Sequence, residues 1–193
     1  MKHSFLIPAA ATALLFAAGT MQAADPDTNG PAAAYCVASG GVVIDRLPAY
    51  GTNGPHTSWL YLNGPRQFCQ FTSATDGLRI HILVETLYDT TPTLAALAYY
   101  AKVAPGAGGG GNPASYYCTY LGGSDSFGGV NAAGGGWVGL NSIDLVLEAC
   151  IFPDLSSIDS WGLFYDSASI VRGIDLTKVM RYQPQAAAVP AAH

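Results

Sequence analysis

Apolar and polar residues alternate in several short stretches of the chain, and this pattern predicts antiparallel strands. Leu78-Arg79-Ile80-His81-Ile82 alternates with the period of two that a half-buried strand shows. Ser58 to Leu62 leads into Asn63-Gly64, a strong signal for a hairpin turn, so we expect the chain to return along Arg66 to Phe71. Further strands are expected at residues 42–44, 137–140 and 143–152.

Short helices are expected between these strands. Pro31 and Pro113 stand at first helical positions, and Asn112 is placed to cap the second of these helices. A Gly pair follows each helix, at 40–41 and 122–123, where it would end the helix. Two further helices are expected over residues 91–103 and 175–182.

The stretch around the first Cys recurs in the second half of the chain. Residues 30–41 and 112–123 share Pro, Ala, Tyr, Cys and two Gly at six of twelve aligned positions. A second match places Cys69 and Phe71 in register with Cys150 and Phe152. Such self-similarity indicates an internal duplication. We therefore expect an α+β chain of two small modules, each a short helix followed by antiparallel strands, at residues 24–104 and 112–183, joined by a Gly-rich linker at 105–111.

The N-terminus has the order of a secretory signal, which we expect at residues 1–23. A basic start precedes an apolar run from Phe5 to Ala18, and small residues follow up to Ala23. The run is shorter than the roughly 20 residues that span a bilayer. No Cys follows it until Cys36, so a lipoprotein is not expected. The protein is therefore predicted to be periplasmic or secreted, and its Ala- and Pro-rich tail, 184–193, to be disordered.

The four Cys residues are predicted to form two disulfides. Export places them in an oxidising compartment, and four Cys allow three pairings. The internal repeat selects Cys36 with Cys69 and Cys118 with Cys150, which closes one loop in each module. A zinc site is not expected, because the chain has no C-x-x-C motif and few His.

The composition excludes some partners. Net charge is −5 and no basic cluster is present, which argues against nucleic acid and anionic lipid. Charged residues make up 11% of the chain, against roughly 25% in ordinary soluble domains. A surface poor in charge is common in exported proteins that bind or assemble, although an Ala- and Gly-biased genome would give the same composition.

No catalytic constellation and no cofactor motif stands out. His81 alternates with apolar residues and is expected to be a solvent-facing or hydrogen-bonded strand residue, while His56 lies in a loop. Asp144 and Glu148 would share one face of a strand. Asp154 and Asp159 are expected to serve as turn and cap residues for the segment around Trp161.

The aromatic residues allow two interpretations. They could line a binding face for glycans or peptides, or they could form the core of a small domain, which is the commoner role. The candidates for a binding face are Trp59, Tyr61, Trp137, Trp161, Phe164 and Tyr165.

Residues 112–165 carry a set of motifs that a known family shares: Asn112-Pro113-Ala114-Ser115, Cys118, Gly122-Gly123, Cys150-Ile151-Phe152-Pro153-Asp154, Ser156 and Trp161. The set resembles the small exported bacterial domain of unknown function that is labelled a hemolysin, and residues 30–88 look like a degenerate copy. Leu155 stands where the family pattern has Gly. Two further Cys of the family are missing, which again leaves Cys118 to pair with Cys150. The resemblance implies a compact α+β module and defines no activity.

These observations favour an exported, non-enzymatic module that binds or assembles with a periplasmic or extracellular protein or polymer, with self-association possible. Two alternatives stay open. One is an inhibitor of secreted proteases that presents a loop such as Tyr50 to Thr57, and the other is a secreted hydrolase or membrane-active factor.

Overall fold

The computed structural model describes residues 30–106, 111–125, 133–139 and 146–185. The predicted signal peptide and most of the predicted linker and tail lie outside these residues, as does Asp144. Signal cleavage and disorder of the tail therefore stay predictions. None of the described helices is long and apolar enough to cross a membrane.

The described residues form short helices and short strands, as the α+β prediction requires. The helices are α1 (Pro31–Ala38), α2 (Val84–Tyr88), α3 (Leu94–Ala101), α4 (Pro113–Tyr120) and α5 (Ser160–Ser167), with 3-10 turns η1 (His56–Ser58) and η2 (Leu176–Lys178). The strands are β1 (Val42–Tyr50), β2 (Leu60–Tyr61), β3 (Arg66–Thr72), β4 (Arg79–Leu83), β5 (Gly135–Val138), β6 (Val146–Leu147), β7 (Ala149–Ile151) and β8 (Ser157–Asp159).

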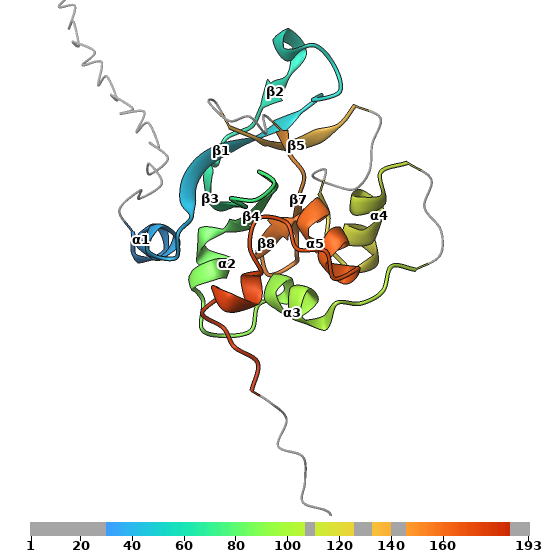
Figure 1. Ribbon diagram of the computed structural model, residues 1–193. Helices are drawn as coiled ribbons and strands as arrows, with labels where there is room; N and C mark the ends of the chain where they lie inside the picture. Colours follow the sequence, from blue (N-terminus) through green and yellow to red (C-terminus); the bar gives the residue numbers. More distant parts are fainter. Residues whose placement is uncertain (1–29, 107–110, 126–132, 140–145, 186–193) are drawn as a thin grey trace, which may run out of the picture.

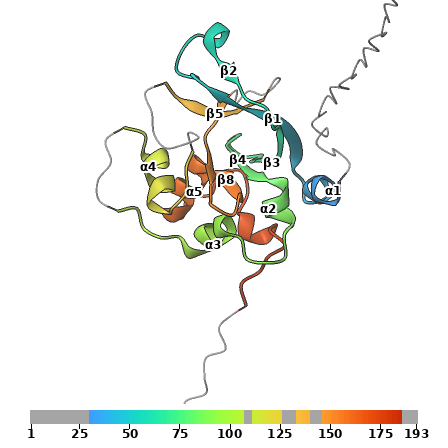
Figure 2. The same ribbon diagram turned by 180° about the vertical axis from the view of Figure 1, so that it is seen from behind.

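The strands pair into one antiparallel sheet that is nearly closed into a barrel (Figures 1 and 2). Its order is β6-β5-β1-β3-β4-β8-β7, and β2 also pairs with β1. Only Glu148 separates β6 from β7, so one continuous segment forms both ends of this order. Long β1 joins the two sides of the barrel, because its first half pairs with β3 and its second half pairs with β5. Closure leaves few unpaired strand edges.

The two predicted modules share this barrel. Strand β1 from the first half pairs with β5 from the second, and β4 pairs with β8. The structure therefore differs from the expected pair of separate small sheets. Strands of two to nine residues expose too much apolar surface alone, and combining the halves buries it inside a common barrel.

The prediction of a hairpin at Asn63-Gly64 is wrong. Strands β2 and β3 do not pair with each other; both run antiparallel to β1, with Tyr50 opposite Leu60 and Arg46 opposite Arg66. The chain reverses earlier, in the loop that carries η1 and protrudes from the barrel (Figure 1). Asn63-Gly64 is thus an interruption between two strands that follow one another along β1.

The helical signals near Pro and Asn are confirmed. Pro31 and Pro113 begin α1 and α4, and the Asn112 side chain caps α4. Helix α3 is shorter than predicted and is capped by Thr93, whose side chain accepts a hydrogen bond from Ala96 N–H. The predicted closing helix at 175–182 is only the 3-10 turn η2, and the five-residue α2 after β4 was not predicted.

Two disulfides join the helices to the outer face of the barrel, between Cys36 and Cys69 and between Cys118 and Cys150. After each helix a Gly adopts a positive φ, 86° at residue 40 and 87° at residue 122. The next Gly lies against the disulfide, where a Cβ would overlap a sulfur atom. The two Cys-bearing stretches therefore share one local structure, and this packing explains why both carry a Gly pair.

Candidate functional site

The outer and inner faces of the barrel have different chemistry. Cys69, Ile80 and Ile158 face outward and pack in the main apolar core, which includes residues of all five helices. Phe68 of β3 and Trp137 of β5, two strands that flank β1, meet in a second cluster inside the barrel. The strand register places polar residues on this inner face as well, at Arg46, Gln70, His81 and Asp159.

These inner polar residues form a layer across the barrel. Arg46 is 1% exposed, and its Nη1 donates to the Trp137 carbonyl oxygen at 3.1 Å. Its Nη2 lies 3.4 Å from His81 Nε2, and Gln70 Oε1 lies 3.0 Å from the same nitrogen. His81 Nδ1 lies 3.3 Å from Asp159 Oδ2. The layer therefore links a buried guanidinium to a buried carboxylate through the imidazole.

Both ring nitrogens of His81 face protein atoms. Nδ1 faces a carboxylate and therefore carries a proton. In the neutral ring Nε2 accepts from Arg46, and in the doubly protonated ring it donates to Gln70. His81 is 2% exposed, so it is the hydrogen-bonded strand residue that was one of the two expectations, and it does not face solvent.

A pocket of about 510 Å³ opens at one end of the barrel interior, on one side of this layer. We call it the polar mouth, because charged and amide side chains line much of it. These are Arg79, Arg172, Glu148, Asp159, Asn53 and Asn112. The mixture of donors and acceptors suits a polar ligand with several hydrogen-bonding groups.

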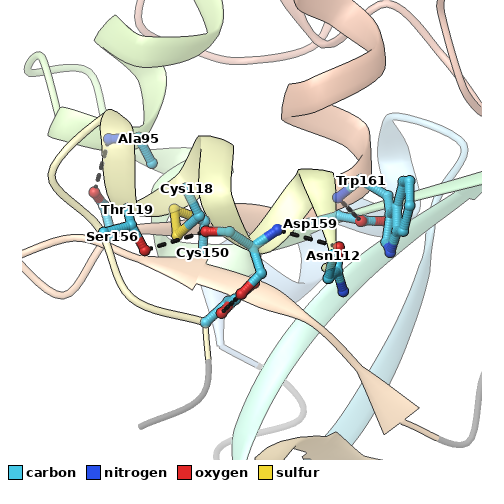
Figure 3. Close-up of a disulfide and its surroundings, with 10 residues drawn as sticks. Ala95, Asn112, Cys118, Thr119, Cys150, Ser156, Asp159 and Trp161 are labelled. Carbon is cyan, nitrogen blue, oxygen red and sulfur yellow. Dashed lines mark hydrogen bonds between the residues drawn. A yellow bond between two sulfur atoms is a disulfide. The ribbon is translucent and has the colours of Figure 1, made fainter. Parts of the chain in front are cut away.

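Glu148 is held at the polar mouth by residues at the start of two helices. Its Oε2 accepts from Asn112 Nδ2 at 2.7 Å and from Trp161 Nε1 at 2.9 Å. Asn112 Oδ1 at the same time accepts from Ala114 and Ser115 N–H and caps α4. Figure 3 shows Asn112, Asp159 and Trp161 on one side of the Cys118–Cys150 disulfide, which ties α4 to β7. The acid is therefore fixed in place before any ligand arrives.

Asp159 has a double role at the same pocket. Its Oδ1 accepts from Trp161 N–H at 3.0 Å and from Gly162 N–H at 3.1 Å, and so caps α5 as predicted (Figure 3). Its Oδ2 faces His81. One carboxylate thus joins the helix cap to the polar layer inside the barrel.

An aromatic platform borders the polar mouth. Trp161 and Tyr165 stack with ring centroids 5.9 Å apart, and the Arg172 guanidinium carbon lies 5.6 Å from the Tyr165 ring centre. Leu78 and Ile170 are exposed beside these rings. Trp161 and Arg172 line both the polar mouth and the platform, so the two surfaces are continuous.

The predicted aromatic residues lie in three places. Trp59 lies in the protruding loop, where the His56 and Trp59 ring centroids are 4.2 Å apart, and the exposed Tyr61 lies on the adjoining β2. Trp137 lies inside the barrel. Trp161, Phe164 and Tyr165 lie together on α5. Of these residues only Trp161 lines the polar mouth and Tyr165 the adjoining platform, whereas Phe164 packs against the main core.

The Pro-Asp-x-Ser turn of the family-like motif has a structural role. Asp154 Oδ2 accepts from Leu94 N–H at 2.7 Å. Ser156 Oγ accepts from Ala95 N–H at 3.0 Å, as Figure 3 shows. Partial burial opposes ionisation of Asp154, but the hydrogen bonds that the carboxylate accepts from Leu94 N–H and from the N–H and hydroxyl group of Ser156 outweigh it and lower the pKa of the carboxyl group. Leu155 has a φ of 65°, the left-handed region that favours the Gly of the family pattern.

Several residues of this site were not singled out from the sequence as site residues, notably Arg46, Gln70, Arg79, Asn112 and Arg172. Asn112 was predicted only as a helix cap.

The described ranges contain no group of three or more His, Cys, Asp or Glu that could hold a metal ion. Comparisons with protein-family models, with curated proteins and with solved structures found no match.

Proposed function

We propose that the protein is an exported, non-enzymatic binding module whose polar mouth binds a saccharide of the bacterial envelope. The observation that carries the proposal is the continuity between the polar mouth and the aromatic platform. A sugar ring presents hydroxyl groups around its edge and C–H groups on its face. The edge needs planar donors and acceptors, and the face needs an aromatic ring.

The charged side chains favour a sugar with an acidic substituent. Arg79 and Arg172 supply guanidinium groups, which bind carboxylates in a bidentate manner. Glu148 already accepts a hydrogen bond from Asn112, and Asp159 already caps α5 and faces His81. Each carboxylate keeps acceptor capacity for hydroxyl groups of a ligand.

The geometry of His81 supports binding without catalysis. A general base must present a nitrogen to the reacting proton. Here one ring nitrogen faces Asp159 and the other faces Gln70 and Arg46, so neither points to a ligand in the pocket.

Export and duplication form part of the same proposal. Two disulfides support an oxidising compartment, and the signal at residues 1–23 would direct the chain there. The shared helix–Gly–Gly–disulfide geometry supports an origin by duplication, with the two copies since joined in one barrel.

Calorimetric titration of the oxidised chain tests the proposal. The probe is the disaccharide of N-acetylglucosamine and N-acetylmuramic acid, and the comparison is neutral di-N-acetylchitobiose. We expect the acidic disaccharide to bind more tightly, and Arg172→Gln to weaken it at least about tenfold, the effect of losing one charge-assisted contact. Lys178→Gln is the matched control, because this exposed Lys lies on η2 and lines no part of the mouth.

Three results would count against the proposal. Absence of binding by both sugars at millimolar concentration would remove the saccharide. An equal loss of affinity in both variants would remove the polar mouth as the site. Cleavage of the disaccharide by the wild-type chain would overturn the non-enzymatic assignment.

A further inference from the structure

The barrel interior has a second opening, at the end opposite the polar mouth. Along β4, Arg79 and His81 line the polar mouth, whereas Leu83 lines the second pocket. Along β8, Asp159 lines the first and Ser157 the second. This second pocket has a volume of about 380 Å³, and we call it the apolar mouth. Its inner wall is hydrocarbon and aromatic, from Phe68, Leu83, Trp137 and Ile151.

Ser157 places a polar atom in this wall. The residue is 2% exposed, and its Oγ has no hydrogen-bond partner among the described residues. The Ser157 side chain lies on the inner face. Ser157 pairs with Ile151 of β7, and the pairing of Ile82 with Ile158 places Ser157 next to Leu83, whose side chain is also on the inner face. A buried hydroxyl group without a partner is unfavourable, and a ligand oxygen in the apolar mouth would satisfy it.

Leu155 is unfavourable in the free protein for two reasons. Its backbone has a φ of 65°, where Gly is favoured over a branched side chain. Its apolar side chain is nevertheless 57% exposed, at the rim of the apolar mouth. A ligand that fills the mouth would cover this side chain. Strained residues that persist are often found at ligand sites.

Arg66 supplies a positive charge at the same rim. It lies on β3 two residues before Phe68 and therefore shares its face. The guanidinium group makes no hydrogen bond or ion pair within the part of the chain that the structure describes. An anionic group of a ligand would find its partner here.

We propose that the apolar mouth binds a medium-chain fatty acid. The chain lies against Phe68, Leu83 and Trp137 and covers Leu155. The carboxylate pairs with Arg66, and the Ser157 hydroxyl group donates to an oxygen atom of the ligand. This site is separate from the saccharide site, since the layer of Arg46, Gln70 and His81 lies between the two mouths.

Titration of the oxidised full chain with decanoate, below its micelle concentration, tests the proposal. We expect saturable binding, with decanol bound at least tenfold more weakly. Arg66→Gln should weaken decanoate at least tenfold, whereas the matched charge-removing variant Lys178→Gln should not. Leu155→Gly should weaken binding about threefold to tenfold without lowering the melting temperature, a combination that a merely structural role would not give.

Other outcomes overturn it. Equal affinity for decanoate and decanol, or no effect of Arg66→Gln, would remove the anionic contact. Loss of decanoate binding in Arg172→Gln, with Arg66→Gln unaffected, would move the ligand to the polar mouth. Saccharide binding is measured on the same variants, so failure of the fatty-acid site leaves the polar-mouth result readable by itself.

Discussion

Strands β4, β5 and β8 contribute to both the polar and the apolar mouth, yet the two mouths bury their lining residues in different ways. At the polar mouth, Asn112 and Asp159 each cap a helix and line the pocket. Their hydrogen bonds satisfy polar groups that would otherwise be costly to bury. At the apolar mouth, Phe68 and Trp137 fill the interior. Polar side chains at the polar mouth are therefore held in place by the N-terminal ends of helices that lie outside the barrel.

The largest effect should come from the apolar side. Phe68 is fully buried, so Phe68→Ala should lower the free energy of unfolding by about 4 kcal/mol. Gln70→Ala, two residues along the same strand face, should lower it by only about 1 kcal/mol, because Gln70 is partly exposed. Urea unfolding of the two variants measures the difference. Equal losses of stability would mean that the inner face is not divided into an apolar part and a polar part.

The two disulfides should separate stability from binding. Replacing either Cys pair by Ala should lower stability by about 3.5 kcal/mol, because the loops of 33 and 32 residues are nearly equal. Only loss of Cys118–Cys150 should also weaken saccharide binding, since this bond anchors the helix that carries Asn112. Calorimetry on both variants checks this, and equal loss of binding in both would contradict the assigned role of α4.

Asp159 should link the polar layer to α5. Asp159→Ala removes the helix cap and the partner of His81, and should lower stability by about 3 kcal/mol. Asp159→Asn keeps an oxygen atom for the cap and should cost about 1 kcal/mol less. Thermal unfolding compares the two. Identical losses would show that the cap contributes nothing.

The other end of α5 should respond to pH. Lys102 Nζ bonds Asp166 Oδ1 at 2.8 Å, but burial still raises the pKa of this carboxyl group. A raised pKa favours the folded state at low pH, and that contribution is lost as the pH rises through the folded value. Lys102→Met should therefore cost about 2 kcal/mol at pH 7 and little below about pH 3, where Asp166 is protonated in both the folded and the unfolded state. A loss of stability that is independent of pH would contradict this account.

The smallest stability effect should be a gain. Leu155→Gly relieves a positive φ but makes the unfolded chain more flexible, so the net gain should be below about 1 kcal/mol. Calorimetric melting measures it. A clear loss of stability would show that the Leu155 side chain serves the free fold, and would remove it as evidence for a ligand.

Local signals predicted local structure well. Asn112 and Asp159 are capping residues in the sequence and in the structure, and the repeat selected the same two Cys pairs that the structure joins. These features depend on residues close in sequence or on a spacing that recurs. They need no knowledge of which distant strands pair.

Long-range pairing was beyond the sequence pattern. The alternation around His81 predicts one buried face, but in this nearly closed barrel the helices cover one face of the sheet and the barrel interior buries the other. Arg46 gave no signal, because its burial depends on His81 and on Trp137 from the second half of the chain. The Asn63-Gly64 signal gave a wrong prediction because β2 and β3 each pair with β1 and not with each other.

The most direct test is to map backbone amide shifts by NMR in one sample titrated with the acidic disaccharide and then with decanoate. We expect two separate sets of perturbed residues. The disaccharide should shift amides around Arg79, Glu148 and Trp161, and decanoate should shift those around Arg66, Leu155 and Ser157. Overlapping sets, or no shifts around the polar mouth with the disaccharide, would contradict the claim that this barrel carries a separate ligand site at each end.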